Sequence, residues 1–126
     1  MSHEDLAFKF CGFVDNFIKE IDHISFIDKN DEIFYRVCLQ KLYYALYHKM
    51  LQHDVALSES NAPNQHETIY KKLLKNDPKL AQLYEKMKSL RVWADYKLDE
   101  IPKSALDLNY LQYQVYKVLR RKTINI

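Results

Sequence analysis

One arginine near the end of a long apolar-periodic segment has neighbours suited to phosphate chemistry. Arg91 is followed four residues later by Asp95 and five residues later by Tyr96. The planar guanidinium group suits phosphate oxygens, but this spacing also suits an i,i+4 ion pair with Asp95 on a helix. Both interpretations of Arg91 remain open. Tyr96 lies about 140° from Arg91 around a continuous helix, so the two share a site only if the helix ends or kinks there, or if a partner chain completes the site.

A histidine within an aromatic segment is the second candidate for chemistry. His48 closely follows Tyr43, Tyr44 and Tyr47. Imidazole is the side chain that titrates near neutrality, so His48 is a candidate for proton transfer, although a histidine among aromatic rings also suits a packed core or an interface. His48 and His53 are five residues apart, whereas zinc-binding pairs on one helical face are four apart. We therefore expect no metal site.

Basic and aromatic residues recur on the last predicted helix. Such lysines and arginines serve either as a phosphate footprint or as a solvated helix end that favours the helix dipole. The tyrosines suit core or interface packing or base stacking. The basic residues are Lys117, Arg120, Arg121 and Lys122, and the tyrosines are Tyr110, Tyr113 and Tyr116.

The composition predicts helices that position these residues. The chain has 126 residues with 48% hydrophobic and 29% charged residues, which suits a single globular domain spanning residues 1–126. It contains one glycine, Gly12, whereas turn-rich β folds and glycine-rich phosphate loops need many. We expect no cofactor, reduced thiols at Cys11 and Cys38, no membrane span, and a cytoplasmic protein.

Hydrophobic periodicity predicts four long helices and one short one. Gly12 interrupts the first helix and suggests a close approach to another helix. The second helix is apolar or aromatic on every side, which is typical of a central helix. The architecture is therefore expected to be an antiparallel four-helix bundle with an additional short helix. The predicted helices span Glu4–Ile24, Asp31–Val55 (with Asn30 as its N-cap), Gln65–Lys75, Pro78–Leu98, and Ser104–Arg121, where Ser104 together with Asp107 marks the helix start.

Three segments, in this order, resemble one branch of the HEPN superfamily. The first is the run Lys41-Leu42-Tyr43-Tyr44-Ala45-Leu46-Tyr47-His48 with Met50-Leu51, which is similar to the "YYAMFH…LL" stretch of a central helix. The second is His66, at the start of the short helix. The third is Leu90-Arg91-Val92-Trp93-Ala94-Asp95-Tyr96, which resembles "R-x-x-A-D-Y".

The resemblance implies an HEPN-like helical bundle and a function in RNA handling. Many HEPN domains are metal-independent ribonucleases of toxin–antitoxin, CRISPR and phage-defence systems, and two copies build one composite site. Their signature is an arginine followed four to six residues later by a histidine. Here the arginine matches Arg91, and Tyr96 stands where the histidine is usual. Tyrosine is a poor general base near neutrality, but it can donate a hydrogen bond or stack on a base.

Two hypotheses of function follow. In the first, the chain is a homodimeric RNA-binding protein and a metal-independent endoribonuclease. Arg91 would stabilise charge on the phosphate, with Tyr96 or His48 assisting proton transfer, and the RNA-binding residues would be Arg91, Asp95, Lys117, Arg120 and Arg121. In the second, the chain is a non-catalytic helical module that dimerises or docks on a nucleotidyltransferase or nuclease partner.

Overall fold

The structure is a computed structural model that describes residues 1–23, 32–60, 65–98 and 100–126. Within these ranges every regular element is a helix and no strand occurs, which confirms the predicted all-α class. In chain order the elements are α1 (His3–Glu20), the 3-10 helix η1 (Ile21–His23), α2 (Glu32–His53), α3 (Val55–Glu59), α4 (Gln65–Asn76), α5 (Pro78–Tyr96), the 3-10 helix η2 (Lys103–Ala105) and α6 (Leu108–Leu119).

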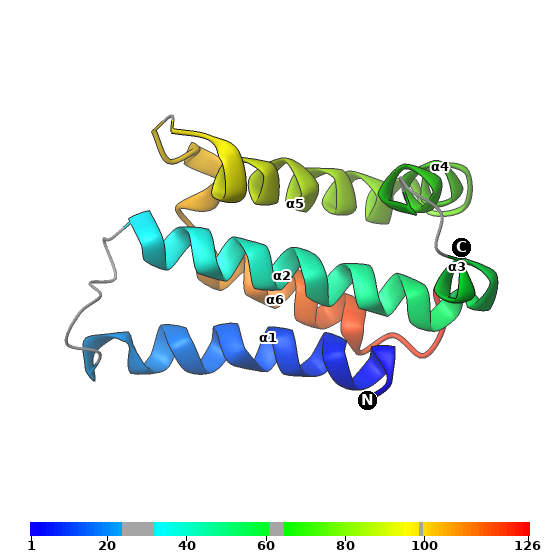
Figure 1. Cartoon of the computed structure of the whole chain (residues 1–126), viewed down its shortest axis with the longest axis horizontal. Helices are drawn as coiled ribbons and strands as arrows, with labels where there is room; N and C mark the ends of the chain where they lie inside the picture. The colour runs from blue at the N-terminus through cyan, green and yellow to red at the C-terminus, as the bar shows by residue number, and fades with distance from the viewer. Residues whose placement is uncertain (24–31, 61–64, 99) are drawn as a thin grey trace.

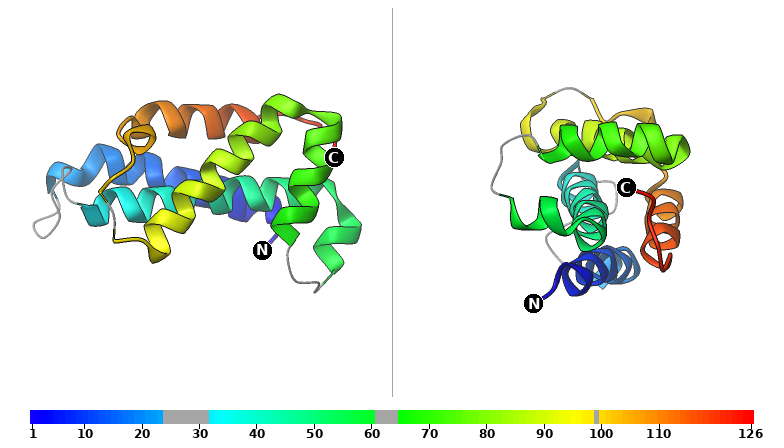
Figure 2. Two further views of the ribbon diagram at one scale, coloured as in Figure 1. Left: turned by 90° about the horizontal axis from the view of Figure 1, so that it is seen from above. Right: turned by 90° about the vertical axis from the view of Figure 1, so that its right-hand side faces the viewer.

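Helix α2 lies at the centre of the fold and packs against α1, α5 and α6. Figure 1 shows that α1, α2, α5 and α6 run in alternating directions along the chain. Seen from above, α5 crosses α2 obliquely, and the end-on view places α1, α6 and the α4–α5 pair on three different sides of α2 (Figure 2). Among the described residues, no long helix lies on the fourth side of α2 (Figure 2).

The burial pattern of α2 explains why its sequence lacks a clean polar face. Helices pack on several of its sides, so apolar and aromatic residues recur all round it. Its buried residues are Phe34, Cys38, Leu39, Leu42, Tyr43, Ala45, Leu46, Lys49, Met50 and Leu51. Both cysteines of the chain, Cys11 and Cys38, are buried free thiols, and burial raises their pKa values to about 11 and about 12. They are therefore protonated at neutral pH.

Side-chain caps fix the starts of several helices. Ser2 and Asp5 form a reciprocal capping box on α1. The carboxylates of Asp77 and Asp107 accept hydrogen bonds from the backbone N–H groups three residues later at the starts of α5 and α6. Pro78 occupies the first turn of α5, where a missing N–H has no cost.

The predicted second helix is interrupted near its end. Asp54 adopts an extended conformation, with φ of −133°, and its carboxylate accepts the N–H of Leu57. This cap ends α2 at His53 and starts the short helix α3, so the predicted helix end at Val55 falls at the first residue of α3. A single aspartate as an internal cap is the physical reason for the difference.

The predicted first, fourth and last helices are each too long. Helix α1 ends at Glu20 and gives way to η1, whereas the sequence predicts helix to Ile24, a residue outside the described ranges, as is Asn30. Helix α5 ends at Tyr96 because Lys97 is extended, with ψ of 144°. The last helix begins at Leu108 rather than Ser104, because Ser104 belongs to η2 and Asp107 caps α6, and it ends at Leu119 rather than Arg121.

Two residues of α1 differ from expectation. Phe13 follows Phe10 by three residues and precedes Phe17 by four, a helical spacing that favours a buried position, but it is 46% exposed. A Cβ atom added at Gly12 would meet nothing within 4 Å, so this glycine does not mark a close helix approach within the chain. In the described part of the chain, no helix is both long and apolar enough to cross a membrane.

Candidate functional site

A groove of about 510 Å³ lies where α2, the start of α4 and α5 meet. None of its lining residues comes from α1 or α6. The lining combines aromatic rings with cationic, amide, imidazole and carboxylate groups, and consists of Tyr43, Tyr44, Tyr47, Gln65, His66, Glu67, Lys88 and Arg91.

Three tyrosines of α2 form the aromatic wall of the groove. Tyr43 and Tyr47 are one helical turn apart and stack with ring centroids 6.2 Å apart. Tyr44 lies edge-on to both rings. Tyr43 is buried, whereas Tyr44 and Tyr47 are half-buried and present ring surface to the groove.

Gln65 attaches the start of α4 to α2 and α3. Its Oε1 accepts a hydrogen bond from the Tyr47 hydroxyl, and its Nε2 donates to the carbonyl oxygens of Leu57 and Ser60. The side chain thus bridges three segments and holds this edge of the groove in place.

Arg91 lies across the tyrosine rings and is paired with Asp95. Its Nη1 donates to Asp95 Oδ2 at 2.6 Å, and its Cζ lies 5.3 Å from the Tyr43 ring centroid and 5.7 Å from that of Tyr44. The carboxylate of Asp95 also accepts from Gln40 Nε2. The Nε of Arg91 is buried and has no hydrogen-bond partner of good geometry within the described ranges. Arg91 is therefore both an ion-pair partner and a groove residue.

His66 is held between two helices at the inner end of the groove. Its Nδ1 lies 3.0 Å from the Tyr43 hydroxyl, and its Nε2 lies 3.2 Å from Glu85 Oε2. Its ring stacks on Tyr84 with centroids 4.6 Å apart and an interplanar angle of 12°. Burial lowers the pKa of His66, and this effect outweighs the nearby carboxylate of Glu85. The imidazole is therefore neutral at neutral pH.

Sequence reasoning did not identify His66, Lys88 or Gln65 as site residues. They reach the groove from α4 and α5, and only the packing of those helices on α2 brings them beside the tyrosines. The sequence carried one signal for these residues. His66, at the start of a predicted helix, was part of the family resemblance, but no function was assigned to it.

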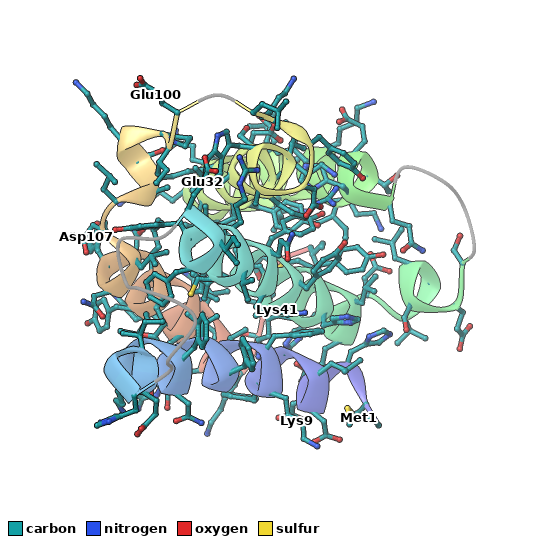
Figure 3. All side chains as sticks on the ribbon, turned by 60° about the vertical axis from the view of Figure 1, so that its left-hand side comes forward. Met1, Lys9, Glu32, Lys41, Glu100 and Asp107 are labelled. Atoms are coloured by element: carbon teal, nitrogen blue, oxygen red, sulfur yellow. The ribbon has the colours of Figure 1, made fainter. Side chains whose placement is uncertain are left out.

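The predicted catalytic candidate His48 faces α1, and it does not line the groove. Its Nδ1 lies 2.9 Å from Nδ1 of His3, and its ring stacks on those of His3 and Phe10. On the same side of α2, Lys41 (labelled in Figure 3) has its Nζ 5.4 Å from the Phe10 ring centroid. His48 and Arg91 thus belong to different sets of contacts.

Tyr96 is the last residue of α5, and it is 71% exposed. Burial alone would lower the pKa of Arg91, but the side chains of Tyr44, Asp95 and Tyr96 outweigh it and raise that pKa. Tyr96 therefore acts on the guanidinium group from the end of the helix, although it does not line the groove.

The other predicted RNA-binding residues lie at the end of α6, away from the groove lining. Lys117 and Arg120 lie over the rings of Tyr113 and Tyr116, and Arg121 pairs with Asp77 at 3.0 Å. Arg120 and Arg121 help line a second cavity of about 480 Å³, which α1 and α2 complete. Of the five predicted RNA-binding residues, only Arg91 lines the groove, with Asp95 bonded to it, and the other three lie at the end of α6.

The side chains of the groove set the chemistry that they themselves can supply. Across the described ranges, no group of three or more histidine, cysteine, aspartate or glutamate side chains is arranged to hold a metal ion. The groove offers a guanidinium group, an ammonium group, a neutral imidazole and three phenol rings. Together these can hold an anion, stack on a planar ring and move a proton.

In comparisons with known proteins, no family model, no curated protein and no solved structure matches this chain.

Proposed function

We propose that this chain is an HEPN-like RNA-binding protein whose groove binds a single-stranded segment of RNA and cleaves it without a metal ion. The observation that carries the proposal is the position of Arg91. Its guanidinium group lies over the rings of Tyr43 and Tyr44 at the wall of a groove that also contains Lys88. Cations placed beside aromatic surfaces are the combination that single-stranded nucleic acids require, because phosphates and bases alternate along the strand.

The three segments that carry the family resemblance meet at this groove. Tyr43, Tyr44 and Tyr47 come from the first segment, His66 is the second, and Arg91 comes from the third. They are far apart in the sequence and lie on three different helices. Their convergence supports the HEPN-like assignment, because it gives these separated residues one shared location.

Hydrogen-bond donors, rather than net charge, would select the ligand. Glu67 lines the groove with Lys88 and Arg91, and Glu85 and Asp95 each bond to a lining residue, so negative and positive groups are close to balance. Arg91 carries five N–H donors and uses one of its Nη atoms for Asp95. Its Nε is buried, so the N–H groups of its Nη atoms that do not face Asp95, together with the ammonium of Lys88, can bind phosphate oxygens. Tyr44 and Tyr47 offer ring surface to a base.

The expected cleavage chemistry is attack of a ribose 2′-hydroxyl on the adjacent phosphate. Arg91 stabilises the charge that develops on the phosphate oxygens, which is the role of a preorganised donor in a partly buried site. The products are a 2′,3′-cyclic phosphate and a 5′-hydroxyl end, and no metal ion is needed.

The test measures binding and cleavage separately. Fluorescence anisotropy with a labelled single-stranded RNA reports binding, and gel analysis of the same RNA in EDTA reports cleavage. Arg91→Gln should weaken binding and abolish cleavage, and Arg91→Lys should restore binding only in part because it lacks the planar fork. Lys19→Gln removes a charge from an exposed residue of α1 and is the matched control. Unchanged binding by Arg91→Gln would overturn the proposal.

A second candidate function is a non-catalytic module that associates with itself or with another protein. The observation that favours it is a row of exposed tyrosines on α6, where Tyr110, Tyr113 and Tyr116 are 53%, 56% and 40% exposed. Exposed aromatic residues are enriched at interfaces. Light scattering over a concentration series would detect a homodimer, and Tyr113→Ser would weaken it.

A further inference from the structure

A phenol and an imidazole of the groove lining are linked to a carboxylate just outside it. Glu85 lies 3.2 Å from one ring nitrogen of His66, and the Tyr43 hydroxyl lies 3.0 Å from the other. The imidazole ring also stacks on Tyr84, so its plane is fixed by packing as well as by both hydrogen bonds. Two helices and the start of a third hold these groups, because Tyr43 is on α2, His66 on α4 and Glu85 on α5.

The tautomer of His66 follows from its partners. An ionised carboxylate can only accept hydrogen bonds, so Nε2 of His66 must carry the proton that faces Glu85. In the neutral ring Nδ1 then has a lone pair, and it accepts the hydrogen bond from the Tyr43 hydroxyl. The phenol proton therefore already points at an unprotonated nitrogen.

We propose that Tyr43, His66 and Glu85 form the proton relay of the groove, in which Tyr43 contacts the ribose and His66 is the base behind it. This inference rests on the proposed RNA cleavage and assigns its proton transfer to residues other than Tyr96 and His48. Tyr43 is only 3% exposed but lines the groove, so the small part of it that is open there is the group in contact with substrate. His66 acts through Tyr43, and Glu85 holds the tautomer and stabilises the imidazolium.

The reaction is one transesterification step in which every proton and bond is accounted for. The Tyr43 oxygen takes the proton of the 2′-hydroxyl as its own proton passes to Nδ1 of His66. The 2′-oxygen forms its bond to phosphorus, the bond from phosphorus to the 5′-oxygen breaks, and the leaving oxygen takes a proton from water. The imidazolium of His66 then returns its extra proton to water. Arg91, with Cζ 5.3 Å from the Tyr43 ring centroid, is close enough to hold the phosphate that reacts.

The surroundings of His66 suit a base that works near neutral pH. Burial lowers its pKa, Glu85 and Glu67 act to raise it, and Lys88 acts to lower it. Tyr43 and Tyr84, which contact the ring, have raised pKa values because they are buried, so both phenols are neutral at rest. A neutral imidazole beside neutral phenols can accept a proton without first losing one.

The test is the pH dependence of RNA cleavage in EDTA, measured under single-turnover conditions. The wild-type rate should rise with pH and level off once His66 is neutral. His66→Gln and Tyr43→Phe should each lower the plateau by about 100-fold or more, the usual contribution of a positioned acid or base. His66→Gln should also remove the inflection. His23→Gln, which changes an exposed histidine of η1, is the control and should leave the profile unchanged.

Glu85→Gln keeps the test valid if a substitution of the buried ring unfolds the protein. Glu85 is half-exposed, and removing its charge should shift the inflection to lower pH while RNA affinity stays within a few-fold of wild type. Cleavage by His66→Gln at the wild-type rate, or an inflection that Glu85→Gln does not move, would overturn the relay and leave the proposed function standing. RNA binding by wild type without cleavage would also overturn the relay but keep RNA binding. No binding at all would remove both.

Discussion

His3 and His48 face each other through their Nδ1 atoms, which are 2.9 Å apart. One of these nitrogens must donate and the other accept, so the contact holds a single proton between two rings. Nε2 of His3 lies 2.8 Å from the Ser58 hydroxyl, so this contact joins the start of α1 to α2 and α3. Protonating both rings would place two positive charges in contact.

The first prediction is that this contact makes stability fall in mild acid. Burial, and secondarily the charge of His3, lowers the folded-state pKa of His48. The unfolded state then binds more protons, so the free energy of unfolding is fully retained above about pH 6.5 and declines as the pH falls toward the folded-state pKa. Urea unfolding at several pH values should show a smaller decline for His48→Gln than for wild type. His53 and His66 also have lowered pKa values and are present in both proteins. Equal declines would therefore show that these residues, and not the His3–His48 pair, cause the loss of stability.

The second prediction concerns Arg36 of α2, whose side chain caps the C-terminus of α5. Its Nη1 donates to the carbonyl oxygens of Trp93 and Ala94 at 2.8 and 2.9 Å, and its Nη2 donates to that of Lys97 at 2.6 Å. Its Cζ also lies 4.1 Å from the Trp93 ring centroid. Arg36→Met should therefore lower the free energy of unfolding by about 2–3 kcal/mol, since it removes several charge-assisted hydrogen bonds and the cation at a helix C-terminus.

Arg36→Lys is the informative control for that prediction. Lysine keeps the charge but cannot bond three carbonyl groups in the plane of one fork, so we expect it to recover about half of the loss. Chemical denaturation followed by circular dichroism measures both variants. Full recovery by lysine would mean that charge alone, rather than the fork, stabilises this helix end.

Features that depend on residues close together in the sequence were predictable, whereas features that depend on contacts between distant segments were not. Local signals worked well: the Asp77–Pro78 start of α5 and the central position of α2 were both evident from residue types and spacing. Helix ends were less predictable, because α5 stops where Arg36, a residue of another helix, captures its last carbonyl groups. No local pattern near Tyr96 carries that information.

The same distinction holds for the candidate site. The spacing from Arg91 to Asp95 allowed an ion pair as one of two interpretations, and the structure contains this ion pair at 2.6 Å. The contact between His66 and Tyr43 joins residues 23 positions apart, and it forms only because α4 packs beside α2. His48, by contrast, is close to Tyr47 in sequence but projects toward α1, because neighbouring residues of a helix point in different directions.

The third prediction is a shallow salt dependence of RNA binding. Lys88 and Arg91 are the two cations that line the groove, so about two phosphates should be neutralised on binding. For single-stranded RNA the slope of log affinity against log salt should then be about −1.4, and Arg91→Gln should reduce it to about −0.7. Anisotropy titrations at a series of salt concentrations provide both slopes. A much steeper wild-type slope that Arg120→Gln reduces would instead locate binding at the end of α6.

The fourth prediction tests whether the face of α1 around Gly12 is open in solution. A Cβ atom at this position would meet nothing within 4 Å, and the residue lies inside a helix, so Gly12→Ala has no steric cost within the chain. Alanine should raise the free energy of unfolding by about 0.5–1 kcal/mol through helix propensity alone. Thermal unfolding and light scattering on the same samples measure stability and association together. A loss of stability accompanied by dissociation would show that a second molecule packs against Gly12, whereas a gain without a change in mass would show that this face is exposed to solvent.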